Sequence, residues 1–321
     1  MPEREIRFGF LASDWSFEFG GGSIEPVADF ADQWAAVEPA MNPEDGFVYP
    51  PTVETVRFPP DRPDLREIVE GTRRTTLLWR LPASHVIRLP SRKVRDVERE
   101  DAWFIINLLA YLFGVRLKLD PWWFDGRVAV RLQRTHNIHF SREAAQDFIS
   151  RSYATWRCWP KRDRTLFATL LHSHCRAPSY EWDWERFGAE YTVLDSLALV
   201  AERPKLIVAP TKTTTTGTPP KKGKKKRRRV AHGERLRTLA KAMGVKRPPA
   251  RVRRIVKLRN ALLHEGLWDG QLPGSGTSRA MQLADDLRRI NHRLIPALLG
   301  YRNQYVRTAW WTIGTRGFDP P

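Results

Sequence analysis

Cysteines and long apolar segments are scarce in this chain, and their scarcity excludes several classes of protein. Only two cysteines, Cys158 and Cys175, occur among the 321 residues. They are too few for a disulfide framework and favour a reducing cytosol. The longest apolar run, residues 102–115, contains Asn107 and is too short to cross a bilayer, and the charged start of the chain has no signal-peptide core. We therefore expect a cytoplasmic protein that has no membrane partner.

Motifs for cofactors and metals are also missing from the sequence. It has no glycine-rich phosphate loop, no internal repeat and no paired CxxC spacing. Cys158, His172, His174 and Cys175 are zinc-ligand types, but the last three crowd within four positions of one predicted helix. Core or surface positions explain them better than a metal site does. We expect no cofactor and no metal, and a metal-dependent enzyme at this cluster is the third-ranked alternative.

Apolar residues are abundant, and their periodicity predicts a mainly α protein. They make up 41% of the chain, which excludes a wholly disordered protein. Residues 1–95 mix strand-like runs with Pro-rich loops and predict a small α+β portion. Residues 96–177 predict a helical region packed with that portion, and residues 178–321 predict a helical domain with a flexible basic insertion at about 203–232. We predict strands over 6–11, 75–80 and 85–89, helices near 26–37 and over 101–113, 142–156, 163–174, 184–201, 233–243, 251–264 and 277–299, and an irregular break over 117–130.

The net charge of +18 is concentrated in one segment of the chain. Residues 201–260 contain 21 lysines and arginines against two acidic residues, whereas basic and acidic residues almost balance elsewhere. This concentration favours a polyanionic partner, most simply RNA. A solvated loop or a nuclear import signal is the alternative for the charge run alone. The predicted RNA-binding residues are Lys221, Lys222, Lys224, Lys225, Lys226, Arg227, Arg228, Arg229, Arg251, Arg254 and Lys257.

The helix predicted over 251–264 carries the residues that most specifically indicate chemistry. Arg259 falls within its apolar stripe, where an arginine is costly unless it meets a carboxylate, a phosphate or a polar cleft. Asn260 and His264 fall on the flank of the stripe, where the packed face gives way to solvent, and Gly266 predicts the end of the helix. The apolar members of the stripe are Val252, Ile255, Val256, Leu262 and Leu263.

Arginine, a polar residue and histidine together suit metal-free attack on an RNA phosphodiester. Histidine exchanges protons near neutral pH, and arginine stabilises charge that develops on a phosphoryl oxygen. The spacing alone is not specific, because an arginine followed five positions later by a histidine occurs five times in the chain. About one such pair is expected by chance. The pair Arg259 and His264 is distinguished by its place on an amphipathic helix, which the other four lack.

The segment 258–266, LRNALLHEG, resembles the motif of the HEPN family of small helical domains. Ribonuclease members of that family carry an arginine, a polar residue that is often asparagine, a short gap and a histidine. The resemblance extends to residues 184–201, which look like the family helix that packs against the motif helix, and it covers about residues 180 to 300. On that second helix Trp184, Phe187, Tyr191, Leu194 and Ala198 form one apolar stripe, and Asp195 borders it as a candidate partner of Arg259.

The resemblance implies an up-and-down helical bundle and a metal-independent endoribonuclease that acts through the ribose 2′-hydroxyl and leaves a cyclic phosphate. The catalytic residues would be Arg259, Asn260 and His264. Five α-helical steps separate Arg259 from His264 by about 7.5 Å along the axis and about 140° around it, so one helix does not assemble them tightly. Because the motifs of two HEPN domains face each other, we expect a homodimer with a composite cleft.

HEPN ribonucleases are similar in role to toxins and antiphage effectors, so a toxin or a defence effector is the expected setting. The sequence identifies neither an antitoxin nor another regulator. The main alternative is a non-catalytic HEPN-like module for RNA binding or regulatory dimerisation. In that case Arg259 pairs structurally with Asp195, and His264 stabilises the helix dipole at the C-terminal end of the helix.

Overall fold

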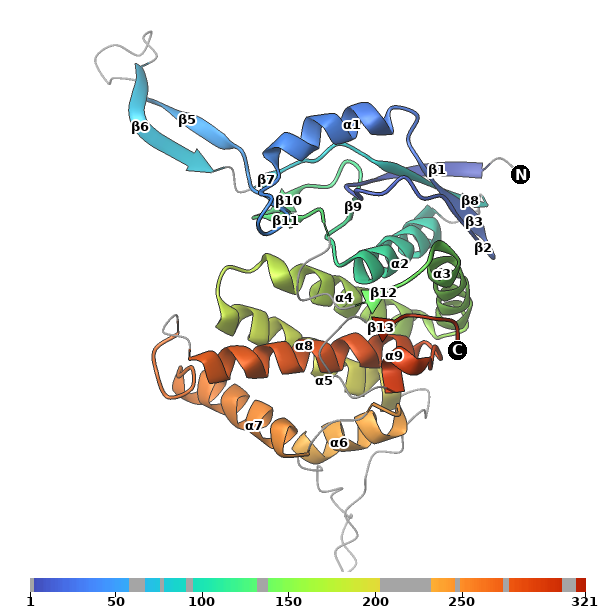
Figure 1. The fold of residues 1–321 in the computed structure, drawn as a ribbon, viewed down its shortest axis with the longest axis vertical. Helices are drawn as coiled ribbons and strands as arrows, with labels where there is room; N and C mark the ends of the chain where they lie inside the picture. Colours follow the sequence, from blue (N-terminus) through green and yellow to red (C-terminus); the bar gives the residue numbers. More distant parts are fainter. Residues whose placement is uncertain are drawn as a thin grey trace, which may run out of the picture. The chain divides into compact units, whose positions relative to one another are not determined.

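The computed structural model divides the chain into two compact units, Met1–His136 and Asn137–Pro321 (Figure 1). It describes residues 3–57, 67–75, 78–90, 95–131, 138–202, 232–245, 249–273, 277–307 and 316–321. The segment 96–177, predicted as one helical region, is shared between the units, because its first helix belongs to the N-terminal unit and its later helices to the C-terminal unit. The predicted basic insertion at about 203–232 lies almost wholly outside the described residues.

The N-terminal unit is built around a five-stranded antiparallel sheet in the order β2-β3-β8-β1-β9. Phe8 and Ile87 share one face of the sheet and are fully buried. On the other face Arg88 forms ion pairs with Glu5 and Glu25. The sheet therefore has one packed face and one solvated face. Its strands are β1 (Glu3–Gly9), β2 (Phe17–Phe19), β3 (Gly22–Pro26), β8 (His85–Pro90) and β9 (Lys118–Leu119).

Two α-helices and three further strand pairs are among the described residues of this unit. The ring of Phe113, at the end of α2 (Arg95–Phe113), lies 6.3 Å from that of Phe17. The ring of Trp34, in α1 (Phe30–Val37), stacks on that of Phe10 at 5.6 Å. The strand pairs are β4 (Phe47–Val48) with β11 (Val128–Ala129), β5 (Thr52–Arg57) with β6 (Glu67–Thr75), and β7 (Leu78–Trp79) with β10 (Phe124–Asp125).

The strands of this unit differ from the prediction in several places. The helix predicted near 26–37 begins only at Phe30, because Pro26 is still part of β3. The strand predicted over 75–80 includes the end of β6 and all of β7. Residues 117–130, predicted as an irregular break, contain three two-residue strands. Strands this short carry no alternating pattern that a sequence can reveal.

The C-terminal unit is helical, and α5 is its central helix. It packs against α4, α6 and α8, so its buried residues extend beyond a single stripe. The rings of Phe148, Tyr301 and Phe318 pack together at 5.0 to 5.3 Å and tie the end of the chain to α3. The helices are α3 (Arg142–Arg157), α4 (Lys161–Arg176), α5 (Asp183–Glu202), α6 (His232–Ala242), α7 (Pro249–Asn260), α8 (Ser278–Leu298) and α9 (Gln304–Arg307).

The prediction of a mainly α protein with a small N-terminal sheet region is confirmed. Each long helix predicted after residue 140 is present with ends that lie within a few residues of the prediction. Ser141 and Thr277 begin α3 and α8 because their hydroxyls accept the backbone N–H three residues later, at 3.2 Å in both cases. In the described ranges, no helix has both the length and the apolar composition that crossing a membrane requires.

Candidate functional site

The candidate site lies at the end of α7, where the helix widens into a single π turn. The turn covers Ala261–Glu265 and follows α7 without a break. The backbone N–H of Gly266 donates to the carbonyl of Ala261, five residues earlier, and Gly266 has a left-handed conformation with φ of 67°. The helix end predicted near Gly266 is therefore confirmed. The π turn was not predicted; such turns are rare and occur frequently at functional sites.

The π turn brings the three predicted catalytic residues together. Nη1 of Arg259 donates to Oδ1 of Asn260 at 3.0 Å, and the same Nη1 lies 3.5 Å from Nε2 of His264. Asn260 and His264 are exposed, and Arg259, which was predicted within the apolar stripe, is partly buried. The end of α7 thus presents a guanidinium, an amide and an imidazole in one exposed cluster.

The prediction that one helix cannot assemble Arg259 and His264 is wrong. It assumed α-helical geometry, in which five residues overshoot a full turn by about 140°. A π turn holds an additional residue because its hydrogen bonds reach five residues back instead of four. The residue five positions later then lies nearly above the starting residue along the helix axis. His264 therefore approaches Arg259 within one chain. The homodimer therefore no longer follows from this geometry and stays a prediction from the family resemblance.

The packed face of α7 is rotated relative to the predicted stripe. Val252, Ile255 and Leu258 are buried, with exposed fractions of 3%, 1% and 5%. Leu263 was placed within the stripe, but it is 60% exposed. The additional residue of the π turn shifts every later position around the helix, which carries Leu263 to the solvent side together with its neighbour His264.

Helix α5 supplies the packed side of the site through Tyr191. The guanidinium carbon of Arg259 lies 5.5 Å from the centroid of the Tyr191 ring, which is a cation–π contact. Tyr191 is 3% exposed, and the predicted stripe positions Phe187, Leu194 and Ala198 are buried as well. The sequence predicted these positions as apolar core and gave no indication that Tyr191 contacts the arginine.

Asp195, the predicted partner of Arg259, acts on the same tyrosine. Burial raises the pKa of Tyr191, Asp195 raises it further, and Arg259 lowers it. Both charged groups therefore lie near the phenol. The structure shows Tyr191 and Asn260 in contact with Arg259, and Asp195 acts on Tyr191; a direct pair of Asp195 with Arg259 stays a prediction.

The cations of α6 and α7 fall into two groups. Arg235 binds both carboxylate oxygens of Glu202, and Arg251 pairs with the buried carboxylate of Asp286. Arg251, predicted as an RNA ligand, thus has a partner within the fold. The second group is exposed, and the described part of the chain contains no ion pair with these residues: Arg237, Lys241, Arg253, Arg254 and Lys257.

The exposed cations of α7 lead directly to the site. Arg253, Lys257 and Asn260 follow one another at steps of four and three residues, the spacing of one helix face, and His264 follows in the π turn. All four are exposed. The predicted RNA-binding residues Lys221 to Arg229 lie outside the described residues, so the exposed charges that the structure places on the helix leading to the site are those of α7.

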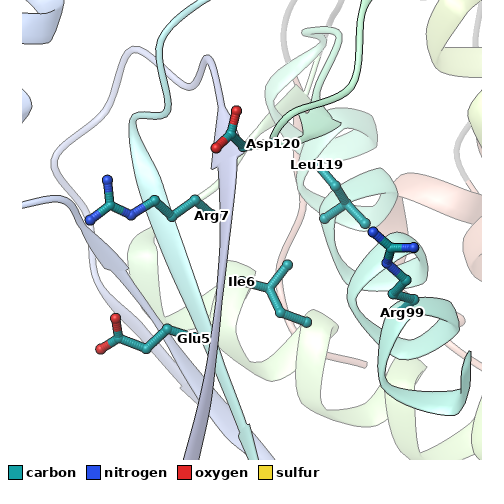
Figure 2. A pocket seen from close by; sticks show the side chains of 6 residues that line it. All are labelled: Glu5, Ile6, Arg7, Arg99, Leu119 and Asp120. Carbon is teal, nitrogen blue, oxygen red and sulfur yellow. The ribbon is translucent and has the colours of Figure 1, made fainter. Parts of the chain in front are cut away.

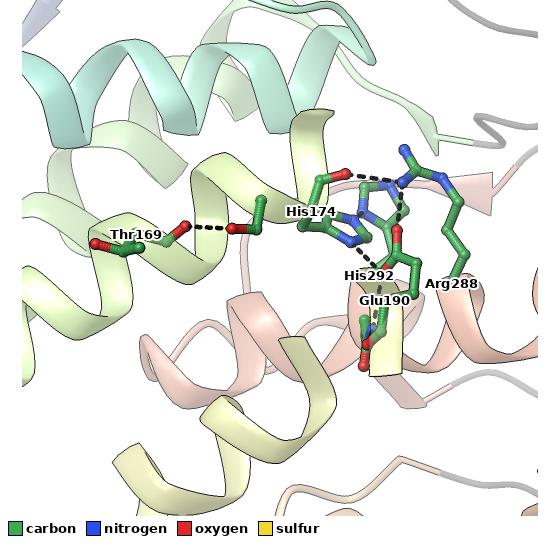
Figure 3. A network of polar contacts seen from close by, with 7 residues as sticks. Thr169, His174, Glu190, Arg288 and His292 are labelled. Carbon is green, nitrogen blue, oxygen red and sulfur yellow. Dashed lines mark hydrogen bonds and ion pairs between the residues drawn. The ribbon is translucent and has the colours of Figure 1, made fainter. Parts of the chain in front are cut away.

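A second polar cluster, which the sequence did not predict, is buried among α4, α5 and α8 (Figure 3). Nδ1 of His174 lies 2.8 Å from Oε2 of Glu190, and Nε2 of His174 lies 3.3 Å from Nδ1 of His292. Nη1 of Arg288 donates to Oε1 of Glu190 at 2.6 Å, and Nδ2 of Asn291 donates to Oε2 at 2.7 Å. One sequence signal existed: three polar residues at i, i+3 and i+4 share a face of α8.

The charges in this buried cluster follow from its contacts. Burial alone would raise the pKa of Glu190, but His174 and Arg288 outweigh burial and lower it. Burial lowers the pKa of His174, and Glu190 opposes that change. The carboxylate accepts from Arg288 and Asn291 and faces Nδ1 of His174, whose Nε2 faces Nδ1 of His292. These groups face one another and hold three helices together.

The zinc-ligand types noted in the sequence belong to the helical unit. Cys175 is buried and Cys158 is exposed. Burial raises the pKa of Cys175 to about 12, so this thiol keeps its proton near neutral pH. His174 is engaged by Glu190 in the buried cluster. Across the described residues, no group of three or more His, Cys, Asp and Glu side chains is arranged to hold a metal ion.

A cavity of about 330 Å³ lies along the outer edge of β1 in the N-terminal unit (Figure 2). Figure 2 shows Glu5 and Arg7 on one side of the strand and Ile6 and Arg99 on the other. Two arginines and two carboxylates line the cavity, so its charge is balanced, and all four are exposed. The charged side chains at this edge lie on both sides of the strand and do not converge on one place where a ligand could bind, so we assign no chemistry to it.

Comparison of the whole chain with family models, with curated proteins and with solved structures finds no match. Both polar clusters lie in the C-terminal unit, and the one at the end of α7 is accessible to a ligand because Asn260 and His264 are exposed.

Proposed function

We propose that this chain is a HEPN-like endoribonuclease that cuts single-stranded RNA without a metal or cofactor. The observation that carries the proposal is the 3.5 Å separation between Nη1 of Arg259 and Nε2 of His264 at an exposed helix end. A phosphodiester bound there meets a cation and a proton-transferring group together. The likeness of residues 258–266 to the HEPN motif supports the same chemistry.

The proposed reaction is a transfer of the phosphoryl group within the RNA strand. His264 takes the proton from the ribose 2′-hydroxyl, and the 2′-oxygen forms a bond to phosphorus. The bond from phosphorus to the 5′-oxygen breaks, and that oxygen leaves with a proton from water or from a second acid. Arg259 stabilises the charge on the phosphoryl oxygens, and Asn260 orients the phosphate. The products are a 2′,3′-cyclic phosphate and a 5′-hydroxyl, and no water is consumed.

The charges on α6 and α7 support RNA as the substrate. The exposed line from Arg253 through Lys257 reaches Asn260 at the spacing of a single helix face, and His264 follows in the π turn. A strand that follows this line presents successive phosphates to cations and arrives at the catalytic cluster. We include Arg253 among the RNA ligands and expect Arg251, which is held by Asp286, to contribute less.

A homodimer belongs to the proposal because of the family resemblance. Two HEPN motifs that face each other would let His264 of a second copy act as the acid that protonates the 5′-oxygen. A toxin or antiphage effector is the setting that this resemblance favours. The N-terminal unit, which lies outside the resemblance, is the candidate place for a regulator to act.

Cleavage of labelled single-stranded RNA in the presence of a chelator tests the catalytic proposal. We expect the purified protein to cut the RNA and expect Arg259→Ala and His264→Ala each to lower the rate by at least about 10²-fold, the usual contribution of one acid–base or charge-stabilising group. Intact RNA with the wild-type protein would contradict the enzyme proposal and leave the RNA-binding alternative. Cleavage that the chelator abolishes would point to a metal-dependent nuclease.

The salt dependence of RNA binding tests the proposed path of the strand. In a His264→Ala background that does not cut, Arg253→Gln with Lys257→Gln should reduce the slope of log affinity against log salt by about 1.4, which is about 0.7 for each phosphate that is no longer neutralised. Arg302→Gln with Arg307→Gln removes the same charge from exposed positions elsewhere in the unit and should leave the slope nearly unchanged. Equal slopes for both pairs would show that binding follows net charge alone.

A further inference from the structure

Two aromatic residues of α5 contact the residues that precede and follow the π turn. Phe187 and Tyr191 are four residues apart, and their ring centroids are 5.9 Å apart. Tyr191 lies under the guanidinium of Arg259, just before the turn. Phe187 meets the ring of Trp268 edge-on at 5.2 Å, and Trp268 lies just after Gly266, the residue that caps the turn.

The contacts on both sides of the turn are buried. Phe187 is fully buried, Trp268 is 1% exposed and Tyr191 is 3% exposed. The backbone of Trp268 is held as well, because its N–H donates to the carbonyl of Gln271 at 2.7 Å. The segment that leaves the π turn is therefore fixed against α5, and so is the arginine that enters it.

A π turn needs such support from its surroundings. It is rare in helices, and an isolated helix of this sequence has no reason to widen at Ala261. If the last turn were α-helical, His264 would rotate away from Arg259. The distance between the two proposed catalytic groups therefore depends on whatever fixes both ends of the turn.

We propose that Phe187, Tyr191 and Trp268 form an aromatic clamp that holds the π turn and positions Arg259 beside His264. Tyr191 is the positioning residue in direct contact with the arginine. Its ring provides the negative π face that attracts the guanidinium, and its burial keeps the arginine from turning toward solvent. Because the aromatic ring, and not the hydroxyl, attracts and covers the guanidinium, phenylalanine at position 191 should hold Arg259 in the same place. This inference rests on the proposed function only for its kinetic test.

The kinetic test compares Tyr191→Phe with Tyr191→Leu. We expect Tyr191→Phe to keep most of the cleavage rate and Tyr191→Leu to lower kcat on the order of tenfold with little change in KM, because Arg259 acts on charge that develops in the transition state. In an Arg259→Ala background, Tyr191→Leu should lower kcat no further. A loss of the same size in both backgrounds would show that Tyr191 does not act through Arg259.

Tyr153→Leu is the matched control. Tyr153 is a buried tyrosine of the same unit and also lies beneath an arginine, Arg157, at 6.0 Å. Its replacement removes a similar ring and a similar cation–π contact away from the site. The kcat of the folded fraction should stay unchanged, whereas an equal loss in kcat would assign the effect of Tyr191→Leu to general loosening of the unit.

A measurement that needs no cleavage separates failure of the clamp from failure of the proposed function. The ring Cε1–Hε1 signal of His264 in a proton–carbon NMR spectrum reports its immediate surroundings. Tyr191→Leu should move this signal in the same direction as Arg259→Ala does, and Tyr191→Phe should leave it nearly in place. An unmoved signal in Tyr191→Leu would overturn the clamp whether or not the protein cuts RNA.

Discussion

Two clusters in the C-terminal unit contain the same residue types and differ in where those residues lie. Arg259, Asn260 and His264 gather at the exposed end of α7. The buried cluster among α4, α5 and α8 also combines an arginine, an asparagine and histidines, but they surround the carboxylate of Glu190. None of the three residues at the end of α7 is a carboxylate, and Asn260 and His264 are exposed to solvent.

The difference shows that burial and pairing, more than residue type, assign a role to such a cluster. A buried carboxylate is stable only when cations and donors compensate its desolvation, and in doing so they use their own hydrogen-bonding groups. The buried cluster is therefore committed to holding helices together. A partly buried guanidinium next to an exposed imidazole keeps donors that a phosphate can accept. We expect the stability of the unit to depend on the buried cluster and its activity to depend on the cluster at the end of α7.

The largest expected effect is on stability. Glu190→Ala removes a carboxylate that Arg288 and His174 contact, and breaking such a buried pair should lower the free energy of unfolding by about 3–5 kcal/mol. His264→Ala, at an exposed position, should change it by less than about 0.5 kcal/mol. Urea unfolding of the two variants measures both values. Similar losses in the two variants would remove the distinction between the clusters.

An intermediate loss of stability should distinguish Arg251, which is paired with Asp286, from the exposed cations of α7. Arg251→Gln leaves the buried carboxylate of Asp286 without its charged partner and should lower the free energy of unfolding by about 1–3 kcal/mol. Arg253→Gln, at an exposed position of the same helix, should cost less than about 0.5 kcal/mol and should weaken RNA binding instead. Urea unfolding measures the loss of stability in each variant, and RNA titration measures the loss of affinity. A larger stability loss in Arg253→Gln, or a larger affinity loss in Arg251→Gln, would contradict this division of the cations.

The smallest effect is the pH dependence of the buried cluster. The pKa of His174 is lowered from 6.5 on folding, so the unfolded chain takes up a proton first as pH falls below 6.5, and stability declines by at most about 1.4 kcal/mol for each pH unit. The lowered pKa of Glu190 adds a further loss when pH falls below 4.5. Urea midpoints between pH 7.5 and 5.0 should decrease with acidity. His174→Gln should flatten this slope, and His264→Ala should retain it.

Much of the helical fold was predictable because it follows from local periodicity. Apolar spacing places α3 and α8 within a residue or two of their observed ends. The N-terminal sheet was only partly predictable. Its strand β9 has two residues, and its pairing with β1 joins segments more than a hundred residues apart. Neither the strand length nor the pairing leaves a local pattern.

The candidate site was predictable in its residues and not in its geometry. Arg259, Asn260 and His264 were singled out because an arginine on an apolar stripe needs a partner. The π turn that joins them depends on tertiary contacts with Tyr191 and Phe187, which no spacing in the sequence encodes. The buried cluster around Glu190 was missed for the same reason, since its members come from three helices.

End-group analysis of cut RNA, in the presence of a chelator, tests most directly that the exposed cluster performs the chemistry and the buried cluster does not. The wild-type protein should leave a 2′,3′-cyclic phosphate and a 5′-hydroxyl at each cut. His174→Gln, which alters the buried cluster, should give the same ends once the folded fraction is accounted for. His264→Ala should fold normally and give neither end, and a folded His264→Ala protein that still yields the cyclic phosphate would contradict the proposal.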